Sequence, residues 1–113
     1  MLPQAHRLKS DKDIKTLSAK GKSVFGMYVG VKARKNSLEV SRFAVAAGVK
    51  VSKKAVDRNR VKRQVRTIVH SHLDEIVPGY DVLLIVRKEA VGKKSSEIEE
   101  QLMKTLAKAK LLV

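Results

Sequence analysis

The chain has 113 residues, with 25 Lys and Arg against 11 Asp and Glu, which gives a formal net charge of +14. This length predicts one domain over residues 1–113, and the charge predicts a polyanionic partner, nucleic acid before an anionic membrane. The absence of Cys excludes disulfides, thiolate metal sites and cysteine nucleophiles, and no apolar run approaches the ~20 residues that span a bilayer. Residues 1–20 also lack the apolar centre of a signal peptide, so we expect a cytoplasmic protein that binds no membrane.

The N-terminal part predicts an arm followed by a short helix. Residues 1–9 carry no periodic pattern and are expected to form the arm. Ser10 and Asp13 then stand at the spacing of a capping box, which predicts the first turn of a helix. Ile14 and Leu17 give this helix one apolar side, so we expect it to pack against a sheet.

The segment 24–34 alternates between two kinds of side chain, which predicts a single strand with one face on the core. The core face would carry Phe25, Met27, Val29, Val31 and Ala33. The open face would carry Tyr28, Lys32 and Arg34. A Tyr among cations on an open strand face is suited to stacking on an unpaired base, but the same pattern also fits a ring that covers its neighbours.

Two further strands and a last helix are expected. Residues 42–50 alternate like a strand, and residues 38–40 either open it or form a separate strand divided from it at Ser41. Residues 82–86 are apolar on both faces, which predicts a central strand. A capping box from Ser96 to Glu99 predicts a final helix with a structural role. The resulting order is α-β-β-α-β-α, or α-β-β-β-α-β-α if the second strand is split at Ser41, and either order predicts an α+β domain.

Residues 50–66 hold eight Lys and Arg against one acid, Asp57, and so carry half of the net charge. A helix over 55–76, stopped by Pro78 and Gly79, would place an apolar stripe toward the core. The stripe consists of Val61, Val65, Ile68 and Val69. The flank beside it would carry Asn59, Lys62, Arg63, Arg66 and His70, with Arg58 at the seam, Arg60 at the back, and Lys50, Lys53 and Lys54 in the preceding loop. Because ordinary surface helices interleave acids with such cations, this pattern favours phosphate binding over a solvated helix.

No catalytic constellation is visible in the sequence. His70 and His72 lie two residues apart, so a helix points them away from a common metal, and we expect both on the surface. The acids are scattered, and no nucleotide-binding loop or Ser/His/Asp motif is present. We therefore expect the chain to supply binding groups and no catalytic residues.

The basic helix resembles the signature of the protein subunit of bacterial ribonuclease P. That family carries Arg-Asn-Arg, one residue, Lys-Arg, two residues and Arg. This chain matches all six positions with Arg58, Asn59, Arg60, Lys62, Arg63 and Arg66. Arg7, Tyr80 and Arg87 also occur in the family's order, so the resemblance covers nearly the whole chain. Two departures stand out, because Ile14 and Ser18 occupy the positions of the family's two Phe, and Gly48 and Val49 replace the Ser-Lys that precedes Lys50.

The resemblance implies a sandwich like the second domain of a small-subunit ribosomal protein, with a mixed sheet and a left-handed β-α-β crossover around the basic helix. Physical reasoning alone favours the right-handed form. It also implies a protein monomer in a 1:1 complex with ribonuclease P RNA, which removes the 5′ leader of precursor tRNA by Mg²⁺-dependent hydrolysis. The catalytic groups and Mg²⁺ would then belong mainly to the RNA.

Two sets of binding residues follow from the charge pattern and the resemblance together. The set expected to bind the RNA subunit is Lys50, Lys53, Lys54, Arg58, Asn59, Arg60, Lys62, Arg63 and Arg66. The set expected to bind the single-stranded leader is Arg7, Ile14, Tyr28, Lys32, Arg34, Lys50 and Arg87. The leader set assumes that the open sheet face and the helix flank converge. A non-catalytic ribosomal or other structured-RNA-binding protein is the alternative, because it would have the same composition and the same basic helix.

Overall fold

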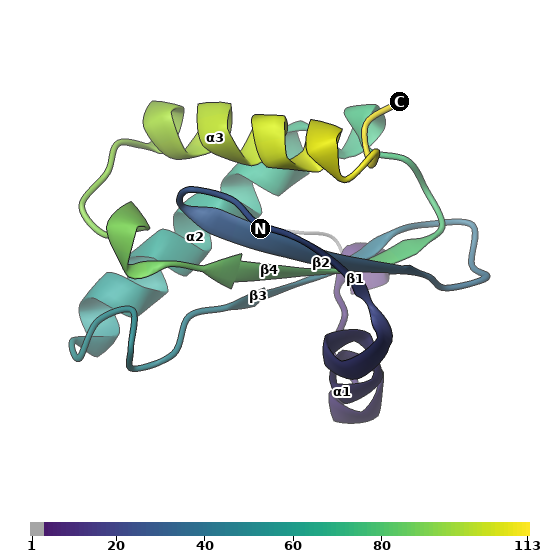
Figure 1. Cartoon of the computed structure of the whole chain (residues 1–113), viewed down its shortest axis with the longest axis horizontal. Coiled ribbons are helices and arrows are strands. Elements are labelled where there is room, and N and C mark those ends of the chain that lie inside the picture. Colours follow the sequence, from purple (N-terminus) through teal and green to yellow (C-terminus); the bar gives the residue numbers. More distant parts are fainter. Residues whose placement is uncertain (1–3) are drawn as a thin grey trace.

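A four-stranded sheet with helices on both faces organises residues 4–113, which a computed structural model of the chain describes (Figure 1). The strands, which stand in the sheet in the order β1-β2-β4-β3, are β1 (Lys22–Val24), β2 (Val29–Lys35), β3 (Arg42–Ala46) and β4 (Tyr80–Val86). The helices are α1 (Asp11–Lys20), α2 (Ala55–Ser71) and α3 (Ser95–Lys108). Helices α2 and α3 lie on one face of the sheet and α1 lies on the other.

The expected α+β class, the mixed sheet and the order α-β-β-β-α-β-α are confirmed. Strand β4 pairs antiparallel with β2 and parallel with β3. Because β3 and β4 are parallel, α2 must carry the chain across the sheet between them, which forms the β-α-β unit. Strand β4 is central, as its apolar faces predict, and β3 and β1 are the two edges.

The core between the sheet and the two helices confirms the predicted stripe of α2. Val61, Val65, Ile68 and Val69 are each no more than 4% exposed. They pack with Val82 and Leu84 of β4 and with the apolar side of α3. A period of 3.6 residues brings these four side chains to one arc of the helix, so burying them fixes which way the opposite arcs point.

A smaller apolar cluster holds α1 on the other face. Leu17 is buried there against Leu8 and Leu83, and Ile14 and Ala44 are partly buried beside them. The predicted N-cap is also present, since the Ser10 hydroxyl oxygen accepts a hydrogen bond from the amide of Asp13 at 3.3 Å. Of the predicted arm, residues 1–3 lie outside the described part, and Gln4–His6 forms a short 3-10 turn.

The predicted single strand over 24–34 is wrong, because the chain turns back between β1 and β2. Phe25 and Met27 are 75% and 54% exposed at this turn, although the alternation places them on the core. The turn depends on Gly26, where an added Cβ would lie 2.1 Å from the carbonyl oxygen of Val29 and 2.7 Å from Oγ1 of Thr105. No residue with a side chain fits that space, so packing against α3 overrides the alternating pattern. The third strand before α2 therefore comes from this hairpin, and residues 38–40 form no strand.

Two helix boundaries also differ from the prediction. Helix α2 ends at Ser71 instead of residue 76, because Ile76 pairs with Leu112 and the amide of Val77 donates to the carbonyl of Leu111 at 2.7 Å. These contacts with the C-terminal segment hold residues 76 and 77 outside helical geometry, so the helix ends before Pro78. Helix α3 begins at Ser95, two residues before the start that a cap at Ser96 predicts, and its N-cap residue Lys94 makes no side-chain hydrogen bond.

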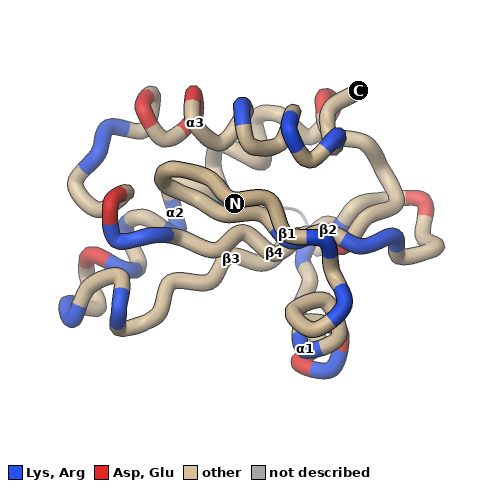
Figure 2. The backbone as a smooth tube through the Cα atoms, in the orientation of Figure 1, with Lys and Arg blue, Asp and Glu red and all other residues tan. Residues whose placement is uncertain are grey.

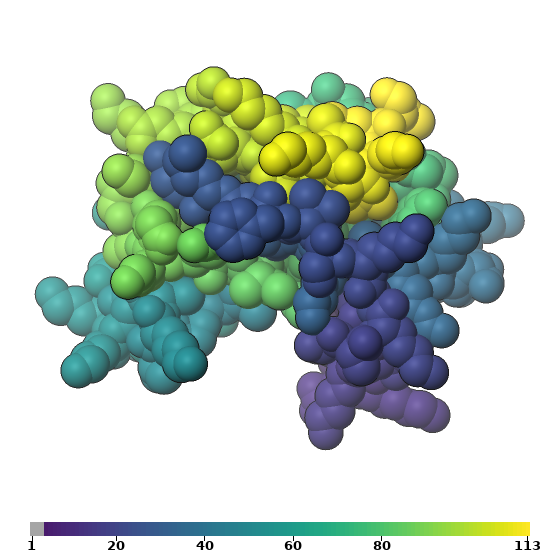
Figure 3. Space-filling model, in the orientation of Figure 1, coloured from purple at the N-terminus to yellow at the C-terminus, as the bar shows by residue number. Residues whose placement is uncertain are grey.

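Positive residues gather in two regions of the molecule (Figure 2). One lies around α2 and the loop that leads into it, and the other lies around β1, the end of β2 and the C-terminal half of α3. The surface is hollowed between α1 and the segment leading into α2, which leaves part of the sheet face uncovered (Figure 3). No helix within residues 4–113 is both long and apolar enough to cross a membrane.

Candidate RNA interface

The loop that leads into α2 is fixed to the helix by hydrogen bonds. Arg58 donates from Nη1 to the carbonyl oxygen of Ser52 at 2.8 Å. The Ser52 hydroxyl donates to Asp57 at 3.0 Å and accepts from the amide of Lys54 at 3.2 Å. Lys53 and Lys54 are exposed on this loop, so the bonds hold their backbone close to the N-terminus of the helix.

The two flanks of α2 have different surroundings. Gln64, on one flank, donates to the hydroxyl of Ser95 at 3.1 Å and to the carbonyl of Lys93 at 3.2 Å, which ties that flank to the start of α3. The other flank borders β3, the edge strand, and no helix covers it. It carries the predicted residues Asn59 and Arg63, both exposed, and Lys62 and Arg66, both half-buried. Arg60 is exposed away from this flank, as predicted.

Asn59 is free to contact a ligand. Three partners are compatible with its side chain in the sequence: a base edge, a ribose hydroxyl, or the end of its own helix. Within the described residues its amide makes no hydrogen bond, so the third alternative is not used. The cap residue Lys54 also lacks a side-chain hydrogen bond to the first turn of α2.

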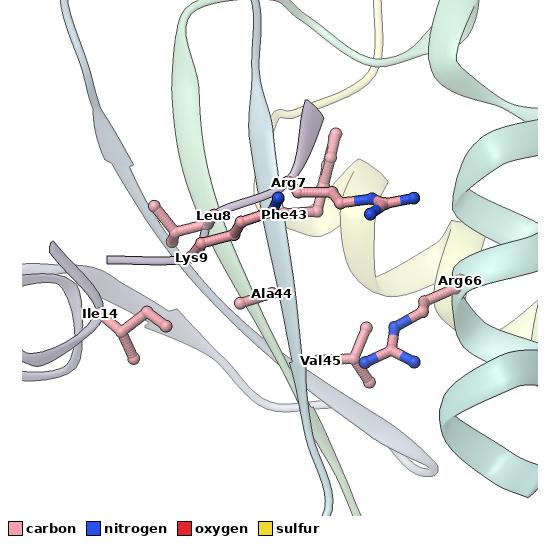
Figure 4. Close-up of a pocket in the computed structure, with 8 residues that line it drawn as sticks. All are labelled: Arg7, Leu8, Lys9, Ile14, Phe43, Ala44, Val45 and Arg66. Carbon is pink, nitrogen blue, oxygen red and sulfur yellow. The ribbon is translucent and has the colours of Figure 1, made fainter. Parts of the chain in front are cut away.

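A pocket of about 400 Å³ lies beside the cationic flank, at the edge of β3. It is lined by Arg7, Leu8, Lys9, Ile14, Phe43, Ala44, Val45 and Arg66. Arg7 and Arg66 enter from opposite sides, one from the arm and one from α2, and their guanidinium groups point toward the same space (Figure 4). Ile14 contributes apolar surface from α1. The pocket therefore combines positive charge with apolar walls, which suits a phosphate linked to a nucleoside.

The arm and α1 are held in place around this pocket by polar contacts. The amide of Leu8 donates to the carbonyl of Phe43 at 2.8 Å, which adds the arm to the edge strand. Arg42 binds both carboxylate oxygens of Asp81 at 2.8 Å and reaches Asp13 of α1 at 3.4 Å. The hydrogen bonds to Asp81 raise the pKa of Arg42 further above its usual value, so this bridge between α1 and the sheet stays charged.

The residues predicted to bind the leader do not form one site. Arg7 and Ile14 line the pocket, together with Arg66 from the other predicted set. Lys32 and Arg87 line a separate groove of about 440 Å³ on the open sheet face, where Lys32 also donates to the carbonyl of Ser18 at 2.7 Å. Arg34 lies at a third place, around the end of β2, and Lys50 stays in the loop before α2. The flank of α2 therefore meets the sheet at the edge of β3. It does not meet the open face of β2, where Lys32 lies.

Tyr28 does not share a face with Lys32, so its predicted position is wrong. It precedes β2, and its ring packs against the core on the helix side, 6.0 Å from the ammonium group of Lys93. The ring therefore covers its neighbours, which is the second of the two readings of this Tyr. Arg87 is also engaged, since its guanidinium lies 4.0 Å from the ring centre of Phe25 and donates to the carbonyl of Gly26.

Five residues of the pocket were not expected from the sequence. They are Leu8, Lys9, Phe43, Ala44 and Val45. The alternation of residues 42–50 identifies β3 as a strand, but only the strand order reveals that it is an edge. Small side chains such as Ala44 were a usable signal, because they leave backbone accessible.

Clustered metal ligands are absent from the part of the chain that the structure describes. Residues 4–113 contain no cluster of three or more His, Cys, Asp or Glu side chains that could hold an ion. His70 is exposed, as predicted. His72 was also expected on the surface, but it is half-buried and its ring binds Glu75 and Glu99. The chemistry that the interface provides is consequently cationic and apolar.

Comparisons with known proteins agree with the motif in α2. The model of the family described as Ribonuclease P matches residues 2–110. A protein of Microcystis aeruginosa named ribonuclease P protein component is 35% identical over 98% of this chain and 96% of its own length.

Solved structures resemble the whole fold. The RNase P protein of Staphylococcus aureus superposes with a TM-score of 0.87 at 27% identity, covering 97% of this chain and all of that one. The RNase P protein of Thermotoga maritima superposes with a TM-score of 0.82 at 30% identity, covering 90% of this chain and 96% of that one. Since the family model, the close relative and the fold all coincide over nearly the full length, the chain belongs to the ribonuclease P protein family.

Proposed function

We propose that this chain is the protein subunit of a ribonuclease P in which the flank of α2 binds the RNA subunit and the pocket beside β3 binds the 5′ leader of precursor tRNA. The proposal rests mainly on one observation: the guanidinium groups of Arg7 and Arg66 point from opposite sides into a pocket that continues the cationic flank. A single monomer would bind one RNA subunit, with the cytoplasm as the proposed compartment.

The flank suits a folded RNA because its cations are held at fixed positions. A core of valines and one isoleucine orients the helix, and like charges along the flank repel one another until phosphates neutralise them. Arg side chains bind phosphate oxygens through two parallel hydrogen bonds, which favours a defined docking geometry over diffuse attraction. Arg63 and Asn59 are exposed and available for this role.

The pocket suits a single strand better than a duplex. Its volume of about 400 Å³ lies in the range of sites for small ligands, so it is large enough for about one nucleotide. Two guanidinium groups would hold the phosphate while Ile14 and Val45 contact the sugar or base. With Ile14 and Ser18 in place of aromatic residues, the wall formed by α1 supplies apolar contact without stacking.

We place the hydrolysis on the RNA subunit and its Mg²⁺ ions. In this proposal Mg²⁺ is held mainly by the RNA, and among residues 4–113 no group of three or more His, Cys, Asp or Glu side chains could hold an ion. The chain would act by binding and orienting the substrate, which increases the effective concentration of the leader at the catalytic RNA.

Reconstitution tests the proposal. The chain is added to a bacterial ribonuclease P RNA at a Mg²⁺ concentration too low for the RNA to act alone, and release of the 5′ leader is measured. We expect cleavage to be restored by the chain and no cleavage by the chain without RNA. Absence of rescue, together with copurification of the chain with ribosomal subunits, would instead support a ribosomal RNA-binding protein.

A further inference from the structure

A second cationic groove, of about 620 Å³, lies at the β1 edge of the sheet. Six Lys and Arg line it, from α1, β1, β2, the end of α3 and the segment that follows α3: Lys20, Lys22, Arg34, Lys35, Lys108 and Lys110. No Asp or Glu lines it. Figure 2 shows these positive segments on the side of the sheet edge opposite β3, and Figure 3 shows the C-terminal segment lying above the β1 region there.

The groove and the α2 region together account for almost the whole charge of the protein. Residues 50–66 carry seven net positive charges and the groove carries six, which leaves one of the fourteen for the rest of the chain. All six side chains of the groove are exposed, and within residues 4–113 none of them forms an ion pair. The remaining surface has nearly balanced charge, so the groove is a separate concentration of cations.

Helix capping explains only part of this pattern. Lys20 and Lys108 close α1 and α3, where positive charge is favoured by the helix dipole. Lys22, Arg34 and Lys35 lie on strands, where no such effect operates. Six like charges around one groove repel, and a single acid among them would relieve the repulsion. The nearest acid, Asp81 opposite Arg34 on β4, is already bound through both carboxylate oxygens by Arg42, so an external anion would supply the compensating charge.

We propose that this groove is a second binding site for an RNA backbone, which lets the protein hold two RNA segments at once. The inference rests on the proposed function, because it takes RNA as the polyanion that the protein meets. Ala33 and Ala109 give the groove a floor of small apolar side chains, which suits the sugars beside bound phosphates. A lipid surface fits less well, because a concave groove without an exposed aromatic residue in its lining cannot insert into a flat bilayer.

The two cationic surfaces act independently. They lie at opposite edges of a four-stranded sheet, so about 14 Å of sheet separates the edge strands at roughly 4.8 Å per strand. For Lys22 of β1 this exceeds the screening length of about 8–10 Å at physiological salt, and for Arg34 and Lys35 of β2, two strands from β3, the separation of about 10 Å roughly equals it, so salt weakens the influence of one surface on the other. The groove therefore has its own RNA segment, from the RNA subunit or from the substrate.

Site-directed photocrosslinking tests the second site. Because the chain has no Cys, Ser23→Cys creates a unique thiol for an aryl azide reagent where this groove meets the groove of Lys32 and Arg87, and the groove charge variants below distinguish the two. Ser96→Cys, on the first turn of α3, is the background control, and His70→Cys reports on the α2 flank. Each protein is assembled with ribonuclease P RNA and precursor tRNA, irradiated, and the crosslinked nucleotides are mapped by primer extension.

We expect crosslinking from Ser23→Cys to exceed that from Ser96→Cys at least five-fold. Adding Lys22→Gln, Lys35→Gln and Lys108→Gln to the Ser23→Cys protein removes three positive charges from the groove. This should reduce the crosslinking yield of Ser23→Cys at least five-fold. Removing three exposed charges elsewhere, with Lys12→Gln, Lys15→Gln and Lys88→Gln, should leave it unchanged. Mapping to the RNA subunit or to precursor tRNA supports the proposal in either case and identifies the segment.

Crosslinking from His70→Cys without crosslinking from Ser23→Cys above background would overturn the second site and leave the proposed function standing. Failure at both positions would overturn both. A Ser23→Cys crosslink that persists in the groove triple variant would also contradict the proposal, since the contact would not depend on the groove's charge. Binding of the free protein to phosphatidylserine vesicles that is lost in the triple variant, without a Ser23→Cys crosslink, would assign the groove to a membrane surface.

Discussion

Arg66 connects the two functions proposed for the interface, because it belongs to the cationic flank of α2 and its guanidinium reaches the pocket beside β3. Its partner across the pocket, Arg7, comes from the arm, more than fifty residues earlier in the sequence. Neither residue lies on the face of β2 on which the alternating pattern placed the leader. Individual positions in this site therefore depend on strand order, which a single sequence does not contain.

Arg66→Ala should weaken the holoenzyme's preference for precursor tRNA over mature tRNA. Losing one charged hydrogen-bond donor to a phosphate costs about 1.5 kcal/mol or more, which corresponds to roughly 10-fold in affinity. The measurement is the ratio of dissociation constants for the two tRNAs, at protein concentrations that saturate the RNA subunit. Lys15→Ala, which removes an exposed charge from α1, is the control. An equal loss for both tRNAs would argue against a leader contact.

His72 makes the stability of the fold depend on pH. Its ring binds Glu75 through Nδ1 and Glu99 of α3 through Nε2 at 3.0 Å, which joins the end of α2 to α3. The hydrogen bond to Glu75, and then that to Glu99, raises the pKa of His72 above its usual value near 6.5. The protonated ring therefore stabilises the folded state fully below about pH 6.5, and this contribution disappears as pH rises through the raised pKa.

We expect His72→Gln to lower the free energy of unfolding by about 0.5–1 kcal/mol at pH 6 and by much less at pH 9. The range is small because both glutamates are largely exposed, so solvent screens the pairs. Urea unfolding at the two pH values measures the difference. A destabilisation of equal size at both would show that protonation of His72 is not its cause.

At the scale of elements, α2 is the part of the fold that the sequence predicts best. Its period of 3.6 residues identifies the buried stripe and the exposed flank, and both are observed. The hairpin of β1 and β2 is predicted worst, because the turn at Gly26 brings its backbone against the carbonyl of Val29 and also against Thr105, 79 positions further along the chain. The predicted start of α3 is wrong for a similar reason. Gln64 of α2 donates a hydrogen bond to the Ser95 hydroxyl, and this contact joins residues 31 positions apart in the chain.

The packing of α2 should control the RNA interface as well as stability. Val65 is fully buried at the centre of the stripe, so Val65→Ala removes two buried methyl groups and leaves a cavity. We expect the free energy of unfolding to fall by about 2 kcal/mol. Chemical denaturation measures this loss, and Val56→Ala, at an exposed position of the same helix, is the control. Equal effects of the two substitutions would contradict the assignment of the buried face.

At the scale of the whole molecule, the charge is divided between two edges of one sheet. The α2 flank and its loop lie toward the β3 edge, and the second groove lies at the β1 edge. The sequence alone locates the first cluster, because its cations are consecutive. It does not reveal the second, because five of its six members come from four elements, the sixth follows α3, and they meet only in the folded chain.

The central claim is that the cations of α2 form a fixed array that binds the RNA subunit. Measuring the dissociation constant for ribonuclease P RNA at a series of salt concentrations tests it most directly. We expect Arg63→Ala to weaken binding and to reduce the slope of log K against log salt by about 0.7–0.9, as loss of one phosphate contact requires, while Lys15→Ala leaves the slope unchanged. An unchanged slope for Arg63→Ala would contradict the account, since it would mean that this flank faces solvent in the complex.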